Sequence, residues 1–360
     1  MGPAGVRIGL DATSLRADRL SGVDRYALEL ARALAALASG EIVLFLRPDA
    51  PEAATRIPVE QHRATVAYRV AIEQAWLPWA AARARVDLLH SLAFPTPLLW
   101  RGRSAVTVHD AVPWLHREAA SLQMRYYDAP LFPQALARAA AIFTVSSSAR
   151  DDLVRALKLP PERFHVTPIG VHERFFAARA ASGPRAPYLL VVGSLAPRRN
   201  LPALLDAFRA LRAEGRDLAL VLVGRRGWDQ PLPVGDLAPH IRLLGAVPDE
   251  ELADLYAGAA CFVLPSLFEG LGLSLAEAMA AGVPAVASDL PALREIGGET
   301  VRYADPRDPQ SLAAAVREAL DDRTGSQLRA AAARGRARRF RWDTCAAATL
   351  RVYRRVLRGG

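Results

Sequence analysis

The sequence predicts an α/β protein built from two doubly wound, Rossmann-like domains with a cleft between them. Short apolar runs alternate with longer amphipathic runs along most of the chain. Residues 177–187 interrupt this pattern with a stretch rich in Pro, Gly and Ala that has no periodicity, and the same alternation then restarts. Buried strands separated by helices are typical of parallel sheets, and such sheets bind ligands at the carboxyl ends of their strands.

The individual elements follow from these runs. Each expected strand is a short apolar run with a polar or turn-forming boundary, and residues 22–37 carry the first long amphipathic pattern. In the first half we expect strands at residues 6–12, 41–46, 88–92, 104–110, 141–146 and 165–171. In the second half the strands are expected at residues 188–195, 218–224, 241–247, 261–266 and 284–289, with helices at 200–215, 250–259 and 275–282. The interruption between the halves is the expected linker, which predicts domains at residues 1–178 and 179–340.

The composition narrows the class of protein. A chain of 360 residues with 51% hydrophobic residues is long enough to form more than one core. Its two cysteines, Cys261 and Cys345, lie far apart and match no metal-ligand spacing, which argues against a disulfide scaffold or a zinc site. No apolar stretch approaches the ~18 residues of a membrane span, and the first residues lead directly into a strand pattern. We therefore expect a cytoplasmic protein.

The net charge of +9 is concentrated near the C-terminus. Residues 329–358 contain ten arginines and one acid, Asp343, so this segment accounts for the whole excess. The remainder of the chain is balanced and offers no second basic face of the kind that a nucleic-acid groove needs. We therefore expect no nucleic-acid partner.

The stretch FEGLGLSLAEAMAAGVP, residues 268–284, predicts a ligand site. It follows the expected strand CFVLPS and forms a glycine-rich turn and then a helix that ends at Gly282. A helix amino terminus attracts anions, so we expect it to bind a phosphate or diphosphate through Gly270, Leu271, Gly272 and Leu273. Glu277 lies further along the helix, where a carboxylate can accept hydrogen bonds from two ribose hydroxyls, and Glu269 precedes the turn. A nucleotide-diphosphate sugar fits both ends.

This stretch resembles the Glu-x7-Glu motif of glycosyltransferase family 4, the retaining transferases of GT-B fold. The likeness continues through SGVDRYALEL, TVHD, FTVSSSARDDL, VTPIGV, VVGSLAPRRNL, LLGAVPDEELADLYAGA and RFRWDTCAAATLRVYRRVL. It implies a retaining, metal-independent enzyme that needs no cofactor and moves a hexose from a nucleotide-diphosphate sugar to an acceptor hydroxyl. It also implies that the C-terminal helix, residues 341–360, crosses back to the first domain.

The resemblance also suggests roles for individual residues. Arg198 and Arg199 are expected beside the diphosphate, although many members have an arginine directly after the VG glycine and a lysine in place of Arg199. His109 is expected to hydrogen-bond the transferred sugar or to share charge with it, and Asp110 is expected to orient the imidazole or contact the acceptor. In the first loop, Gly22 is expected to allow close backbone approach.

Several alternatives remain open at this point. The first-loop and TVHD regions look like bacterial mannosyltransferases, which suggests GDP-mannose as donor and polysaccharide or glycolipid assembly as the setting. A nucleotide-sugar epimerase shares the architecture, as does a phosphorylase, although the single lysine, Lys158, lies in the wrong domain to hold pyridoxal phosphate. A non-enzymatic basic binding protein would use only the arginine-rich tail.

The tail itself has two interpretations. Its arginines either form the solvated face of the last helix or bind an anionic membrane that carries a lipid-linked acceptor. The second interpretation predicts salt-sensitive vesicle binding that weakens when Arg354, Arg355 and Arg358 become glutamine. The segment RVAIEQAWLPWAAARARV, residues 69–86, would add a second contact, unless Trp76 and Trp79 belong to the core.

Overall fold

The chain divides into two compact units. The computed structural model describes residues 5–16, 21–66, 68–93, 95–117, 122, 124–179, 187–225 and 232–359. The first unit comprises Met1–Gly170 with Trp342–Gly360, and the second comprises Val171–Arg341. The boundary thus precedes the expected linker, part of which, residues 180–186, lies outside the described residues. Residues after Gly170 belong to the second unit because Val171 donates to the carbonyl of Phe340 at 3.0 Å and Phe175 and Phe176 are buried there.

A parallel sheet forms the centre of the first unit. Its strand order is β3-β2-β1-β4-β5-β6-β7, so the winding reverses between β1 and β4, where such sheets bind ligands. The strands are β1 (Ile8–Asp11), β2 (Ile42–Leu46), β3 (Glu60–Arg63), β4 (Leu88–Ser91), β5 (Arg103–Thr107), β6 (Ala141–Thr144) and β7 (Phe164–Val166). The helices are α1 (Gly22–Ala38), α2 (Glu52–Thr55), α3 (Arg69–Ala71), η1 (Ile72–Trp76), α4 (Leu77–Arg83), α5 (Val112–Leu115), η3 (Met124–Asp128), α6 (Ala129–Arg138), α7 (Ser147–Leu157), η4 (Pro161–Arg163) and α15 (Trp342–Arg358).

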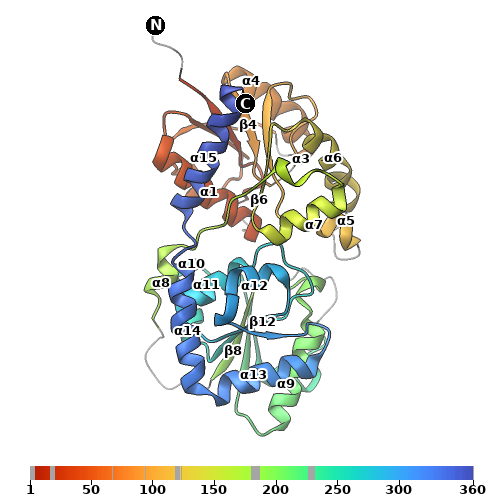
Figure 1. The fold of residues 1–360 in the computed structure, drawn as a ribbon, viewed down its shortest axis with the longest axis vertical. Helices are drawn as coiled ribbons and strands as arrows, with labels where there is room; N and C mark the ends of the chain where they lie inside the picture. Colours follow the sequence, from red (N-terminus) through yellow and green to blue (C-terminus); the bar gives the residue numbers. More distant parts are fainter. Residues whose placement is uncertain are drawn as a thin grey trace. The chain divides into compact units, whose positions relative to one another are not determined.

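The last helix, α15, belongs to the first unit and lies along α1 (Figure 1). Its apolar face is covered: Tyr353 is fully buried, as is Tyr26 on α1. Both tyrosines join a polar cluster on the sheet, where His90 Nε2 lies 2.8 Å from Thr107 Oγ1, His90 Nδ1 bonds the Tyr353 hydroxyl, and the Tyr26 hydroxyl lies 3.4 Å from Thr107. Buried polar groups need such partners, so the cluster fixes how α1 and α15 pack on the sheet.

The second unit repeats the architecture with the strand order β10-β9-β8-β11-β12-β13, again all parallel. The two sheets confirm the predicted fold class. The strands are β8 (Tyr188–Val192), β9 (Ala219–Val223), β10 (Ile241–Gly245), β11 (Cys261–Leu264), β12 (Ala285–Ser288) and β13 (Arg302–Ala304). The helices are α8 (Glu173–Ala177), η5 (Pro197–Arg199), α9 (Leu201–Ala213), η6 (Gly235–His240), α10 (Asp249–Gly258), α11 (Leu273–Ala281), α12 (Pro291–Gly297), η7 (Gly298–Thr300), α13 (Pro309–Asp321) and α14 (Arg323–Ala337).

Helices cover both faces of the second sheet. On one face α9 and α13 pack side by side over a core that includes Val191, Phe208, Leu220, Val263 and Val316 (Figure 1). On the other face α11 packs against α14 and α10. Among the described residues of both units, no helix combines the length and apolarity needed to cross a bilayer.

Candidate active site

The amino end of α11 has the form expected for an anion site. Gly272 precedes the helix in the left-handed conformation with φ +74°, and a Cβ placed there would lie 2.6 Å from the Leu293 side chain. Only glycine fits this position without strain. The amides of Leu275 and Ala276 donate to the carbonyl of Gly272 at 3.0 and 3.1 Å, so the amides of Gly272 and Leu273 lie ahead of the first intrahelical bonds. Such amides and the helix dipole attract a phosphate.

Glu277 lies one helical turn further along α11 and is held in place by a tyrosine. Its carboxyl Oε2 accepts a hydrogen bond from the hydroxyl of Tyr256 at 3.0 Å, and the same hydroxyl lies 3.1 Å from the carbonyl of Ser274. Tyr256 is fully buried on α10, where its ring packs edge-on against Phe175 and also contacts Phe262. Glu277 itself is only 4% exposed. The carboxylate is therefore oriented by α10 before any ligand binds.

Glu269 forms the centre of an ion-pair network with the two predicted arginines. The guanidinium of Arg199 pairs with Glu269 and also donates to Ser266 Oγ at 2.9 Å, while Ser266 donates to Glu269 Oε1 at 3.0 Å. Arg198 lies 3.4 Å from the same carboxylate. The side chains of Glu269 and Arg199 are both 7% exposed, whereas that of Arg198 is 31% exposed. Arg198 is thus the more accessible cation, and Arg199 is the buried partner of Glu269.

The charges in this network do not cancel. Burial alone would raise the pKa of Glu269, but Arg199 and Arg198 outweigh burial and hold this pKa below its ordinary value. Glu269 is therefore ionised at neutral pH. Two guanidiniums share one carboxylate, which leaves one formal positive charge to attract an anion. The Arg199 Nε atom is buried without a hydrogen-bond partner among the described residues.

Three residues of the candidate site were not predicted from the sequence: Gly193, Ser266 and Tyr256. Gly193 has φ +132°, and a Cβ there would lie 2.3 Å from Arg199 Nη2, so the guanidinium can pass only over a glycine. A signal for Gly193 exists, since it ends the apolar run YLLVVG directly before the arginine loop. Ser266 and Tyr256 carry no comparable signal, because their partners lie elsewhere in the chain.

His109 follows β5 in the first unit. Its Nε2 lies 2.9 Å from the carbonyl of Leu92, and because a carbonyl only accepts, Nε2 carries the proton. The ring meets that of Tyr26 edge-on, with centroids 4.7 Å apart. Burial lowers the pKa of His109, although its bond to Leu92 and the nearby Asp110 and Asp24 oppose this effect. A neutral imidazole with a protonated Nε2 keeps Nδ1 as a hydrogen-bond acceptor, so His109 suits a sugar hydroxyl better than a shared positive charge.

The structure shows local contacts for Asp110 and Gly22, whose expected roles stay predictions. Asp110 Oδ1 accepts from the amide of Val112 at 3.0 Å at the start of α5, while the imidazole of His109 is oriented by the carbonyl of Leu92. Gly22 is the first residue of α1, which Ser21 caps, and a Cβ at Gly22 would meet nothing within 4 Å. No contact within the described protein requires a glycine there.

Comparisons with known proteins decide the family. A family model described as Glycosyltransferase Family 4 matches residues 20–175, and one described as Glycosyl transferases group 1 matches residues 186–322. The O-antigen chain mannosyltransferase B of Escherichia coli is 32% identical over 278 residues, which is 70% of each chain. The chain belongs to glycosyltransferase family 4. The MMP alpha-(1->4)-mannosyltransferase of Mycolicibacterium hassiacum is 34% identical over 229 residues, which is 60% of this chain and 54% of its own length.

Solved structures show the fold of this family 4 glycosyltransferase. Sucrose-phosphate synthase from Thermosynechococcus elongatus matches with a TM-score of 0.79 at 20% identity, covering 99% of this chain and all of the other. Anabaena HepE in complex with UDP and glucose matches with a TM-score of 0.75 at 17% identity, covering 98% and 100%. Both likenesses extend over the two units.

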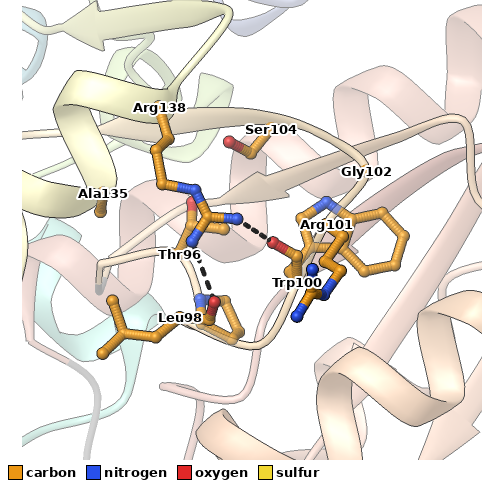
Figure 2. Close-up of a pocket in the computed structure, with 9 residues that line it drawn as sticks. Thr96, Leu98, Trp100, Arg101, Gly102, Ser104, Ala135 and Arg138 are labelled. Atoms are coloured by element: carbon orange, nitrogen blue, oxygen red, sulfur yellow. Dashed lines mark hydrogen bonds between the residues drawn. The ribbon is translucent and has the colours of Figure 1, made fainter.

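One pocket of the first unit does not coincide with the predicted site. It has a volume of about 240 Å³ and lies between the loop before β5 and α6 in the first unit of the glycosyltransferase (Figure 2). Ser104 lines it at the amino end of β5, whereas His109 follows the carboxyl end of that strand. Because parallel sheets bind substrates at their carboxyl edge, we assign this pocket no part in sugar transfer.

Lys158 offers no support for the phosphorylase alternative. Helix α7 ends at Leu157, and Lys158 follows it in the left-handed conformation with φ +54°. It belongs to the first unit, whereas Glu269, Glu277 and the arginines belong to the second. Across the described parts of the chain, no group of three or more His, Cys, Asp or Glu side chains is arranged to hold a metal ion.

Proposed function

We propose that this glycosyltransferase moves mannose from GDP-mannose to a hydroxyl of a saccharide or lipid-linked acceptor, with retention of the anomeric configuration and without a metal ion. The observation that carries the proposal is the convergence in one unit of the α11 amino terminus, the Arg198–Arg199–Glu269 network and the Tyr256-oriented Glu277. Each part matches one portion of a nucleotide-diphosphate sugar.

The diphosphate is assigned to the cationic end of this arrangement. The leaving group gains about one negative charge as its bond to the sugar breaks, and preorganised charges lower the energy of that state most effectively. The helix amides ahead of Leu275 and the accessible guanidinium of Arg198 supply hydrogen-bond donors and positive charge, while Arg199 is fixed by Glu269 and Ser266. These groups can neutralise the diphosphate without Mg²⁺, which supports metal independence.

The ribose is assigned to Glu277. A carboxylate accepts hydrogen bonds from two neighbouring hydroxyls, and Tyr256 holds this one in a fixed orientation. Preorganisation of this kind raises affinity because less side-chain freedom is lost when the ligand binds.

The transfer step needs no enzyme nucleophile. We propose that the bond between the anomeric carbon and the phosphate oxygen breaks while the acceptor oxygen forms a new bond on the same face of the sugar. The acceptor proton passes to the departing phosphate. The neutral His109 accepts a hydrogen bond from a sugar hydroxyl, and the ionised Glu269 holds Arg198 and Arg199 where the departing diphosphate gains its charge.

Mannose is favoured by the 32% identity with an E. coli mannosyltransferase whose name assigns it to O-antigen chains. The neighbouring HepE structure contains UDP and glucose, so UDP-glucose is the second donor to consider. The choice between them is open to direct measurement.

Calorimetric titration with GDP-mannose, UDP-glucose and UDP-galactose tests the donor, and NMR of the product tests the anomeric configuration. We expect binding of GDP-mannose in the presence of EDTA and an α-linked product from the α-linked donor. Preference for a uridine nucleotide would reject mannose from GDP-mannose. A β-linked product would reject retention, and loss of activity on chelation would reject metal independence.

A further inference from the structure

Six large apolar side chains are exposed on one region of the first unit. Their exposed fractions range from 37% for Leu98 to 82% for Tyr68. We call this set the apolar surface; its members are Tyr68, Val70, Leu98, Leu99, Leu122 and Tyr126. Tyr68 and Val70 flank the start of α3, and Leu98 and Leu99 lie in the loop before β5. Leu122 lies just before η3, and Tyr126 lies within η3.

Hydrogen bonds show that these segments adjoin. Gln74 on η1 accepts from the amide of Leu98 at 2.9 Å and donates to the hydroxyl of Tyr127 at 3.5 Å. Gln74 therefore links the helix after Tyr68 and Val70 to both other segments. Arg69 spans the same gap, because its Nη1 lies 3.3 Å from Asp128 Oδ2 and its guanidinium lies 5.4 Å from the ring centre of Tyr127.

Buried polar contacts hold these segments in place from beneath. Arg69 pairs with Glu73 on η1 and with Asp128 on η3, and both acidic residues are buried. Figure 2 shows Arg138 donating to the carbonyls of Leu98 and Trp100, which fixes the backbone of the loop that carries Leu98 and Leu99. Keeping the apolar side chains of these anchored segments in contact with water costs free energy. Exposed apolar patches of this kind are typical of interaction surfaces.

The sequence segments that carry the apolar surface contain more arginines than acids. The only carboxylates in residues 63–83, 95–103 and 122–138 are Glu73 and Asp128, and both are buried and paired with Arg69. The same ranges hold seven arginines, of which Arg63, Arg83, Arg101, Arg103 and Arg138 are exposed. Exposed aromatic and aliphatic groups among arginines, with no exposed acid in these ranges, suit the interface of an anionic bilayer.

We infer that the apolar surface, and not the arginine-rich helix α15, is the part of this enzyme that docks on an anionic lipid bilayer. An interfacial helix needs an apolar face to insert, and that face of α15 is already buried: Leu350, Val352 and Tyr353 are each at most 9% exposed. The arginines of α15 are its solvated face, and Arg354 lies 3.6 Å from Glu41. The inference rests on the proposed lipid-linked acceptor for its purpose, because docking would bring the enzyme to such an acceptor.

Vesicle flotation tests the inference without donor or acceptor, so its outcome is independent of the proposed reaction. The probe is phosphatidylcholine vesicles with or without phosphatidylglycerol, at low salt. The test variant replaces Tyr68, Leu99 and Tyr126 by serine. The matched control replaces the exposed Leu37, Leu243 and Leu328 by serine, and a second comparator replaces Arg354, Arg355 and Arg358 by glutamine.

We expect the wild-type protein and the control to float with phosphatidylglycerol vesicles, and the test variant to lose about tenfold in partitioning, because exposed apolar groups insert between the headgroups. The glutamine variant should lose less than the test variant. Thermal unfolding confirms that all variants fold. Equal flotation of test and control variants would overturn the inference, as would a greater loss in the glutamine variant. A lipid-free dimer that only the test variant abolishes would assign the surface to self-association instead.

Discussion

Replacing Tyr256 by phenylalanine should weaken donor binding through Glu277, although Tyr256 itself need not touch the ligand. The substitution removes one hydroxyl and keeps the ring, which packs between Phe175 and Phe262. A hydrogen bond to a charged acceptor contributes about 1.5–3 kcal/mol. The Tyr256 hydroxyl divides its bonding between Glu277 and the carbonyl of Ser274, so the lower end of that range applies. About 1.4 kcal/mol corresponds to a tenfold change in the dissociation constant.

A double-mutant cycle separates this effect from a general loss of stability. Donor affinity is measured by calorimetry for wild type, Tyr256→Phe, Glu277→Gln and the double variant. We expect Glu277→Gln to weaken binding by about tenfold or more, because the amide replaces a charge-assisted acceptor, and Tyr256→Phe by up to about tenfold. The double variant should resemble Glu277→Gln alone, because the tyrosine acts only through the carboxylate.

Tyr188→Phe is the matched control, since the Tyr188 hydroxyl also donates to a carbonyl in the second unit, that of Leu255 at 2.7 Å. It should leave donor affinity unchanged. Two results would refute the reasoning: additive losses in the cycle, or an equal loss in the Tyr188 variant. Wild-type affinity in Glu277→Gln would reject the ribose assignment itself.

Three further predictions follow from the buried charges. Glu269→Gln should reduce turnover more than nucleotide affinity. Chemical denaturation should show that it lowers the free energy of unfolding by about 3–5 kcal/mol, because it leaves the buried guanidinium of Arg199 unpaired. The same measurement should show a loss of only about 0–1 kcal/mol for Arg198→Gln, because Arg198 is more exposed. Burial lowers the pKa of His90 to about 3 from 6.5, so the first unit should lose stability as pH falls from 6.5 towards 3. In the His90→Asn variant, the free energy of unfolding should vary less with pH over this range. Burial raises the pKa of Glu73 to about 7 from 4.5 despite Arg69, so stability should instead fall as pH rises through that range, and a Glu73→Gln profile without this decline is the expected result.

The fold was predictable because most strands are apolar runs that are buried on both faces. The exceptions are instructive. β3 has the sequence EQHR and carries no apolar signal; it is a strand because it pairs along the edge of β2. Likewise, η1 and η3 are π-helical, and their buried Glu73 and Asp128 come together only through Arg69. Interactions of this kind depend on tertiary contacts that local periodicity does not encode.

The candidate site shows the same division. The local sequence predicted the anion site at the amino end of α11, because a strand, a glycine turn and a helix follow one another directly in residues 261–282. The pairing of Arg199 with Glu269 joins residues 70 positions apart and depends on the missing side chain of Gly193. The sequence therefore indicated which residues to consider, but not that the two arginines would already share a carboxylate.

The two glutamates of the motif consequently play unlike parts, although they are eight residues apart. Glu277 accepts a hydrogen bond from the neutral hydroxyl of Tyr256, and we assign its carboxylate to the hydroxyl donors of a ligand. Glu269 pairs with two guanidiniums, which lower its pKa, so its charge serves to position these two cations. Removing the charge of Glu269 would increase the net positive charge near the amino end of α11. Nucleotide affinity should therefore survive that change while the geometry needed for transfer is lost, whereas removing the charge of Glu277 acts on affinity directly.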